Sequence, residues 1–130
     1  MKRILVIDDD MSVRRFVKHA LELAGFSVED AADGWSGMQI FHRDPFDMVI
    51  TDIFMPGKEG LDIIDELTEE FPDVKTIAIS GGGLYDKDYA LELAIELGAH
   101  QYLAKPFTAD DMLDIVYDLF EIPDPRNVVT

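Results

Sequence analysis

Five short apolar segments alternate with longer segments of helical period, and this alternation constrains the fold more than any other feature of the chain. The first of these segments is a continuous apolar run and the third is mostly apolar, as expected of strands buried on both faces. The five short segments lie at residues 3–7, 26–29, 46–51, 76–79 and 101–104. Strands that alternate with helices favour a parallel sheet covered on both faces. The sequence therefore predicts an α/β class, three-layer (βα)5 flavodoxin-like fold with strand order 2-1-3-4-5.

The helical segments have recognisable ends. The first carries apolar residues at helical spacing from Val13 to Ala24 and stops at Gly25. The last begins at Thr108 with Asp111 three residues later, which resembles a capping box. The segments between them are marked by Trp35, Met38 and Phe41, by Leu61, Ile64, Leu67 and Phe71, and by Ala90, Leu93, Ala94 and Leu97.

The domain organisation follows from length and composition. A chain of 130 residues, 48% hydrophobic and 29% charged, has the size and balance of one globular domain. We expect that domain at residues 1–120, followed by a C-terminal tail or the start of a linker at 121–130. The first apolar run is too short for a signal peptide or a membrane span, so a cytoplasmic protein is expected. The absence of cysteine excludes disulfides and Cys-ligated zinc.

The net charge of −16 argues against one class of partner. Such a chain repels phosphate backbones, so we expect no direct binding of nucleic acid. The acidic residues indicate a chemical site only where several of them lie close together.

Polar side chains follow the predicted strands at the places where the strands end. Asp8 and Asp9 follow the first strand, Asp52 the third, Ser80 the fourth and Lys105 the fifth. Each has an ordinary interpretation alone, as a helix cap, a turn residue or a solvated lysine. The carboxyl ends of parallel strands meet at one edge, however, and clustered carboxylates repel one another unless a cation neutralises them. Oxygen ligands suit Mg²⁺, and a metal beside a lysine and a carboxylate nucleophile suits a phosphoryl group.

In this order the motifs resemble the receiver domain of response regulators (CheY-like) in two-component signalling, over residues 2–120. The motifs are Asp8-Asp9 after an apolar strand, Thr51-Asp52-Ile53-Phe54-Met55-Pro56-Gly57, Ser80-Gly81, and Tyr102-Leu103-Ala104-Lys105-Pro106. The resemblance implies that Asp52 is the phosphoacceptor, taking its phosphoryl group from a histidine kinase or a histidine phosphotransfer protein. It also implies a cis Lys105–Pro106 bond.

The resemblance assigns the other site residues as well. The Mg²⁺ ligands would be Asp9 directly, Asp8 largely through water, Asp52, and the backbone carbonyl of Phe54. Lys105 and Ser80 would contact the phosphoryl oxygens, and Tyr102 would be an aromatic switch that follows Ser80 inward.

The implied protein is a signalling switch that catalyses only its own phosphorylation and dephosphorylation. Its signal would reach the face formed by the fourth helix, the fifth strand and the last helix, where a downstream partner or an output domain reads it. A homodimer through that same face is compatible with the resemblance.

Two other readings stay open. Asp8-x-Asp10-x-Ser12 fits the loose pattern of haloacid-dehalogenase-like Mg²⁺ phosphatases, in which Asp8 would be the nucleophile. Those enzymes need a late acidic pair at another strand end, whereas Asp110-Asp111 opens a predicted helix. A flavodoxin-like binding module is disfavoured because the first strand–helix turn has carboxylates where a Gly-rich phosphate loop would lie.

Overall fold

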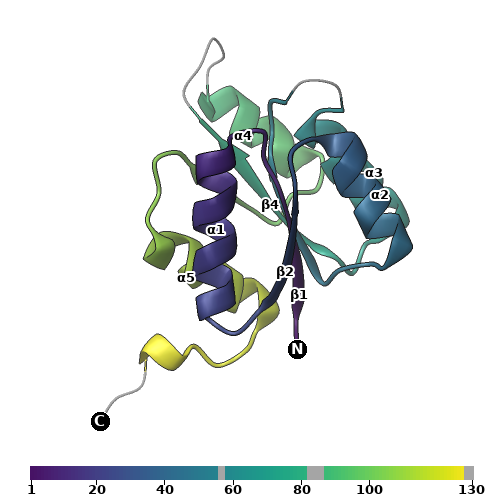
Figure 1. Ribbon diagram of the computed structural model, residues 1–130. Helices are drawn as coiled ribbons and strands as arrows, with labels where there is room; N and C mark the ends of the chain where they lie inside the picture. The colour runs from purple at the N-terminus through teal and green to yellow at the C-terminus, as the bar shows by residue number, and fades with distance from the viewer. Residues whose placement is uncertain (56–57, 82–86, 128–130) are drawn as a thin grey trace.

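The computed structural model describes residues 1–55, 58–81 and 87–127 of the chain, and within them one parallel sheet has the strand order β2-β1-β3-β4-β5. The strands are β1 (Arg3–Ile7), β2 (Ser27–Ala31), β3 (Met48–Asp52), β4 (Lys75–Ser80) and β5 (Gln101–Ala104). The helices are α1 (Met11–Leu23), α2 (Gly34–Arg43), α3 (Gly60–Glu70), α4 (Lys87–Glu96) and α5 (Ala109–Phe120), followed by the short 3₁₀ helix η1 (Pro125–Asn127). The predicted fold class and strand order are confirmed (Figure 1).

Helices cover both faces of the sheet, which explains why the central strands β1 and β3 are mostly apolar. Ile4 and Val6 of β1 pack in a cluster with α1 and α5, while Leu5 and Ile7 pack with α2 and α3 on the other face (Figure 1). The helix α4 joins the second face, where its alanines pack beside Ile64 of α3. A strand with both faces covered needs apolar side chains at every position.

Some details differ from the sequence prediction. The second strand is Ser27–Ala31 rather than 26–29, and the third is shifted, so that β3 includes Asp52, which pairs in register with Ile79 of β4. Phe16 and Trp35 lie on helices as their spacing predicts, but 44% of Phe16 and 65% of Trp35 is exposed. Helical spacing identified the helices without showing that these two aromatic residues face solvent.

The helix caps follow the local sequence. Asp10 is the N-cap of α1, and its Oδ1 accepts hydrogen bonds from the backbone and the hydroxyl of Ser12 at 2.9 and 2.6 Å. These hydrogen bonds hold the pKa of Asp10 below its usual value. Thr108 and Asp111 form the capping box of α5. None of the helices in the described part of the chain combines the length and the apolar character that crossing a bilayer requires.

Candidate functional site

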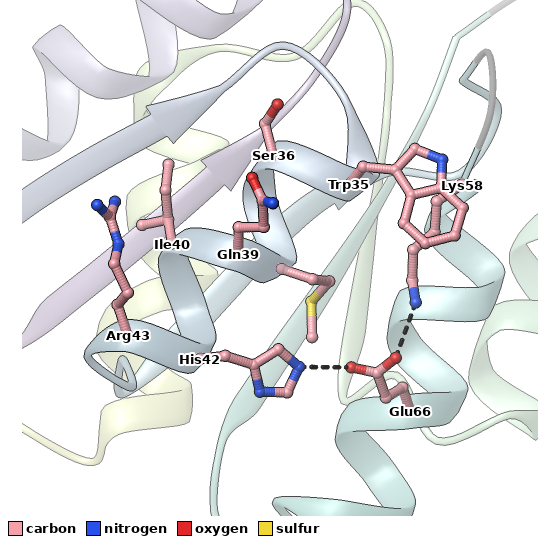
Figure 2. A pocket seen from close by; sticks show the side chains of 9 residues that line it. Trp35, Ser36, Gln39, Ile40, His42, Arg43, Lys58 and Glu66 are labelled. Carbon is pink, nitrogen blue, oxygen red and sulfur yellow. Dashed lines mark hydrogen bonds and ion pairs between the residues drawn. The ribbon is translucent and has the colours of Figure 1, made fainter.

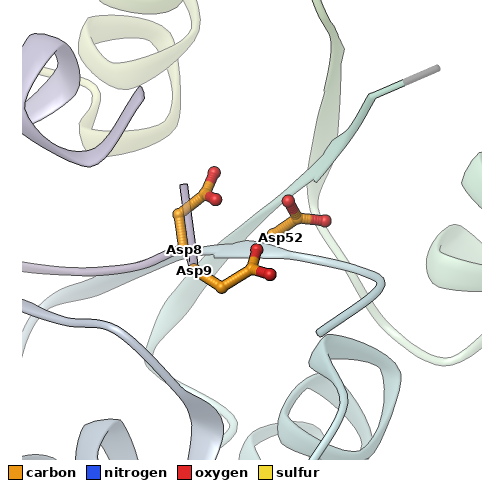
Figure 3. Close-up of side chains that lie close together, drawn as sticks. All are labelled: Asp8, Asp9 and Asp52. Atoms are coloured by element: carbon orange, nitrogen blue, oxygen red, sulfur yellow. The ribbon is translucent and has the colours of Figure 1, made fainter. Parts of the chain in front are cut away.

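The candidate site lies at the carboxyl edge of the sheet, where parallel register aligns the strand ends. Ile7 pairs with Thr51 and Asp52 with Ile79, so the residues that follow β1 and those that end β3 and β4 are neighbours. Figure 3 shows the carboxylates of Asp8, Asp9 and Asp52 converging from the ends of β1 and β3. Loops and helix starts at this edge of a parallel sheet commonly form the ligand site.

The three carboxylates are close together but differ in exposure. Asp8 is fully buried and Asp52 almost so, whereas Asp9 is exposed. Each offers one oxygen, and these oxygens all lie within 4.8 Å of one another. The structure thus brings together, from separate parts of the chain, the three acids singled out in the sequence.

Lys105, just after β5, supplies the positive charge of the site. Its Nζ donates a hydrogen bond to Asp52 Oδ2 at 2.9 Å and lies 3.2 Å from Asp8 Oδ2. Partial burial works against the charged form of the lysine, but the hydrogen bond to Asp52 and the two negative charges outweigh it and raise the pKa of Lys105. The single positive charge of Lys105 therefore lies between two buried carboxylates.

The arrangement makes ionisation of the Asp8 carboxyl unfavourable. Burial, reinforced by the charge on Asp52, raises the pKa of Asp8 from 3.8 to about 6, although a hydrogen bond from the backbone of Asp10 and the charge on Lys105 oppose the rise. Its Oδ1 accepts that hydrogen bond at 2.9 Å. Its Oδ2 is buried and, despite the ion pair with Lys105, has no hydrogen-bond partner among the described residues. The site therefore holds negative charge that its own groups neutralise only in part.

These observations fit a hard divalent cation. The donor set consists of carboxylate oxygens from three residues, and within the described residues the buried Asp8 Oδ2 has an ion pair with Lys105 but no hydrogen bond. Mg²⁺ takes oxygen ligands and relies on only a few protein carboxylates. The acidic pocket could hold such an ion between Asp8, Asp9 and Asp52.

The Asp52 carboxylate is held from both sides. Its Oδ1 accepts a hydrogen bond from the backbone N–H of Phe54 at 3.0 Å, while Oδ2 takes the one from Lys105. Gly60, the first residue of α3, packs so tightly on this strand end that a Cβ there would overlap the carbonyl oxygen of Asp52. Gly60 was not among the predicted site residues, because a glycine that opens a helix gives no local sign of what it will touch.

Ser80 and Tyr102 lie in different environments. Ser80 is fully buried at the end of β4, and its Oγ lacks a hydrogen-bond partner within the described residues. Its carbonyl accepts a hydrogen bond from the backbone N–H of Lys105 at 2.8 Å, which ties the two strand ends together. Tyr102 on β5 is 46% exposed. The Lys105–Pro106 bond is cis, as the resemblance implied.

The cavities do not all lie at the carboxylates. A cavity of about 850 Å³ lies between α2, Lys58 and the middle of α3, where Glu66 accepts a hydrogen bond from Lys58 and pairs with His42 (Figure 2). A smaller cavity of about 560 Å³ adjoins the site and is lined by Lys105, Gly81 and Asp10 together with Phe16 and Phe107. We assign the functional site to the carboxylates, because a buried acceptor without a hydrogen bond points to a ligand and cavity size alone does not.

Comparison with known proteins gives one consistent result. Residues 4–117 match the family described as "Response regulator receiver domain". A probable transcriptional regulator, ycf27, of Cyanophora paradoxa is 35% identical over 112 residues, which are 85% of this chain and 45% of that protein. The C4-dicarboxylate transport transcriptional regulatory protein DctD of Rhizobium meliloti (strain 1021) is 36% identical over 110 residues, 85% of this chain and 23% of that protein. The chain thus spans less than half the length of these two relatives.

A solved structure agrees over the entire fold. The response regulator receiver domain protein of Clostridium thermocellum superposes with a TM-score of 0.84 and 35% identity. The superposition covers 93% of this chain and 95% of that one. Sequence and structure therefore agree on the same family.

Proposed function

This chain belongs to the response regulator receiver domain family, whose members are signalling switches, and on that premise we propose that Asp52 is its phosphoacceptor. The donor would be the phosphohistidine of a histidine kinase or a histidine phosphotransfer protein. The observation that carries the proposal is the placement of the Asp52 carboxylate, oriented by Lys105 and Phe54 beside two further acids.

The proposed step is a displacement at phosphorus. A carboxylate oxygen of Asp52 forms a bond to phosphorus, the bond from phosphorus to the histidine nitrogen breaks, and that nitrogen leaves with the electron pair. Lys105, which now binds Asp52 Oδ2, is placed to exchange that contact for an oxygen of the transferred group. A Mg²⁺ ion held by Asp8, Asp9, Asp52 and the backbone carbonyl of Phe54 would neutralise charge on the transferring oxygens.

Ser80 supplies the proposed response. Its buried Oγ, unpartnered within the described residues, can donate to a phosphoryl oxygen that arrives at Asp52. Lys105 and Ser80 are linked through the backbone, so both strand ends respond together, and the exposed Tyr102 would move inward after Ser80. The change would shift the population of the face formed by α4, β5 and α5, which a downstream partner or an output domain reads. We assign the receiver to residues 1–120 and regard 121–130 as a C-terminal tail or the start of a linker.

The test is intact-mass analysis after incubation with Mg²⁺ and acetyl phosphate. We expect the wild type and the control Asp65→Asn, an exposed acid on α3, to gain one phosphoryl group. Asp52→Asn should gain none, and hydroxylamine should strip the group from the wild type, since acyl phosphates react with it. A phosphoryl gain by Asp52→Asn equal to that of the wild type would refute the assignment.

The same experiment separates the phosphatase alternative. If Asp8 were the nucleophile, Asp8→Asn would abolish labelling and Asp52→Asn would retain it. We expect the opposite dependence, with Asp8→Asn slowing the reaction through the metal site.

A further inference from the structure

The C-terminal tail does not leave the domain after α5 but folds back along it. Glu121 adopts a left-handed conformation with φ of 54° and turns the chain. Ile122 then packs against the main core, and its N–H donates to the carbonyl of Tyr117 at 3.4 Å. The described part of the tail reaches η1 (Figure 1), and there Arg126 contacts Asp110 in the first turn of α5.

Arg126 binds three carboxylates at once. Its Nη1 lies 3.1 Å from Asp110 Oδ1, and its Nη2 lies 2.7 Å from Asp114 Oδ1 and 2.6 Å from Asp124 Oδ2. The guanidinium also lies 5.6 Å from the ring centroid of Tyr117. Only 27% of the Arg126 side chain is exposed, although it lies on the surface of the domain.

Within the tail, Asp124 orients the Arg126 side chain for its contacts with α5. Its Oδ1 accepts hydrogen bonds from the backbone N–H and the Nε of Arg126, at 2.9 and 3.0 Å. The guanidinium is thereby oriented with both terminal nitrogens toward α5. Asp110 and Asp114 are four residues apart and so lie on the same face of that helix.

The solvent face of α5 is an acidic stripe. The helix contains four aspartates, Asp110, Asp111, Asp114 and Asp118, and no basic residue. The side chains of Asp110 and Asp114 remain 84% and 71% exposed even with Arg126 in place. The stripe is therefore accessible to a cation from outside the domain, and the structure shows that it accepts a guanidinium.

We propose that the Asp110–Asp114 stripe is a docking site for an arginine-bearing segment of a partner protein, and that Arg126 occupies this site in cis. The tail and the partner then exclude each other, so the tail regulates access to the face of α5. The inference does not depend on phosphoryl transfer to Asp52, because the acids and the tail are present in the unmodified chain.

The geometry favours arginine over lysine in the partner. A guanidinium presents donors on two terminal nitrogens, and Arg126 uses one for Asp110 and the other for Asp114. A lysine ammonium is a compact point charge without this planar fork. Because an exposed ion-pair cluster is weak, removing Arg126 should tighten binding of a competing arginine peptide by about three- to tenfold.

The test measures binding of a peptide of Arg-Gly repeats that carries a neutral dye, by fluorescence anisotropy at 50 mM NaCl with the full chain. Arg126→Gln should bind it about three- to tenfold more tightly than the wild type. The matched control is Arg15→Gln, which makes the same change in net charge at an exposed position on α1. This control should bind within about twofold of the wild type, the variation expected of a surface charge away from the site.

A second pair of variants locates the peptide. Adding Asp114→Asn to Arg126→Gln should abolish the gain, whereas adding Asp65→Asn, an exposed acid on α3, should preserve it. Equal peptide affinities for Arg126→Gln and Arg15→Gln would overturn the proposal. Equal losses of peptide affinity on adding Asp114→Asn or Asp65→Asn would also overturn it, and so would the absence of measurable peptide binding by Arg126→Gln. In the wild type, saturating peptide should also accelerate amide exchange at residues 122–127, and unchanged exchange there would contradict mutual exclusion.

Discussion

Two clusters in this domain each combine one basic side chain with several aspartates, and they differ mainly in how deeply the aspartates are buried. In one, Lys105 contacts Asp52 and Asp8 at 2.9 and 3.2 Å; in the other, Arg126 contacts Asp114 at 2.7 Å along with two more acids. The carboxylates of the first cluster that touch the cation are buried, whereas Asp114 is 71% exposed. Similar distances therefore carry different energies, because water solvates the charges of the second cluster and is excluded from most of the first.

The difference supports both proposals, phosphoryl chemistry at the buried cluster and docking at the exposed one. Buried acids that outnumber their cation hold charge in need of a ligand, as the raised pKa of Asp8 shows. The exposed acids of α5 lose little interaction free energy when a cation leaves, since water then solvates them. A contact that is weak and reversible can be exchanged for a partner.

The largest expected effect is on stability at neutral pH without metal. Replacing Asp8 by Asn should stabilise the fold by up to about 3 kcal/mol at pH 7, since ionising a carboxyl whose pKa is about 6 when folded and 3.8 otherwise opposes folding. Asp114→Asn should change stability by less than about 0.5 kcal/mol, as exposed positions usually do. Urea denaturation in EDTA measures both. Equal effects of the two replacements would remove the contrast between the clusters.

The pH dependence of the two clusters should have opposite sign. Because the folded pKa of Asp8 is raised, its contribution to stability is fully present below pH 3.8 and is lost as pH rises through about 6. The pKa of Asp124 is lowered, chiefly by its hydrogen bond from Arg126, so its contribution is present above its usual pKa and is lost as pH falls.

Urea midpoints at pH 4, 5, 6 and 7 test this difference in EDTA. The stability gap between Asp8→Asn and the wild type should narrow steadily from pH 7 to pH 4. A gap that stayed constant over that range would show that Asp8 titrates alike in the folded and unfolded chain.

The stabilisation by Mg²⁺ should also distinguish the two clusters. Mg²⁺ at 100 times its Kd should stabilise the wild type by about 2.7 kcal/mol, since it binds the folded state alone. Asp9→Asn should lose most of this gain, and Asp110→Asn should keep it, because Asp110 lies outside the group of carboxylates that could hold the ion. Thermal denaturation with and without Mg²⁺ gives the comparison, and an equal gain in both variants would place the ion elsewhere.

The smallest effect should come from the exposed cluster. Arg126→Gln should destabilise the domain by about 1 kcal/mol or less, within the range of surface ion pairs. The loss should vanish in 1 M NaCl, where the Debye length is about 3 Å. Lys105→Gln, measured in the same way, should show an effect that salt changes little, since partly buried charges are screened less. A salt-insensitive effect at Arg126 would mean that its pairs are not solvated.

The buried cluster was predictable and the exposed one was not, for a physical reason. Asp8, Asp52 and Lys105 each follow an apolar run, and a parallel sheet brings the ends of such runs to one edge. Arg126 lies in a segment interpreted only as a tail or linker, with no periodicity to indicate where it packs. Of its partners on α5, Asp110 was interpreted only as part of the start of a helix.

The sequence by itself determined the strand order, the helix caps and the set of acids that share an edge, because these depend on local propensity and on the burial pattern of each segment. Only the tertiary structure decided how deeply each acid is buried, that Gly60 packs on the carbonyl of Asp52, and that the tail returns to α5. Burial and close contact depend on atoms distant in the chain, and a one-dimensional pattern does not specify those distances.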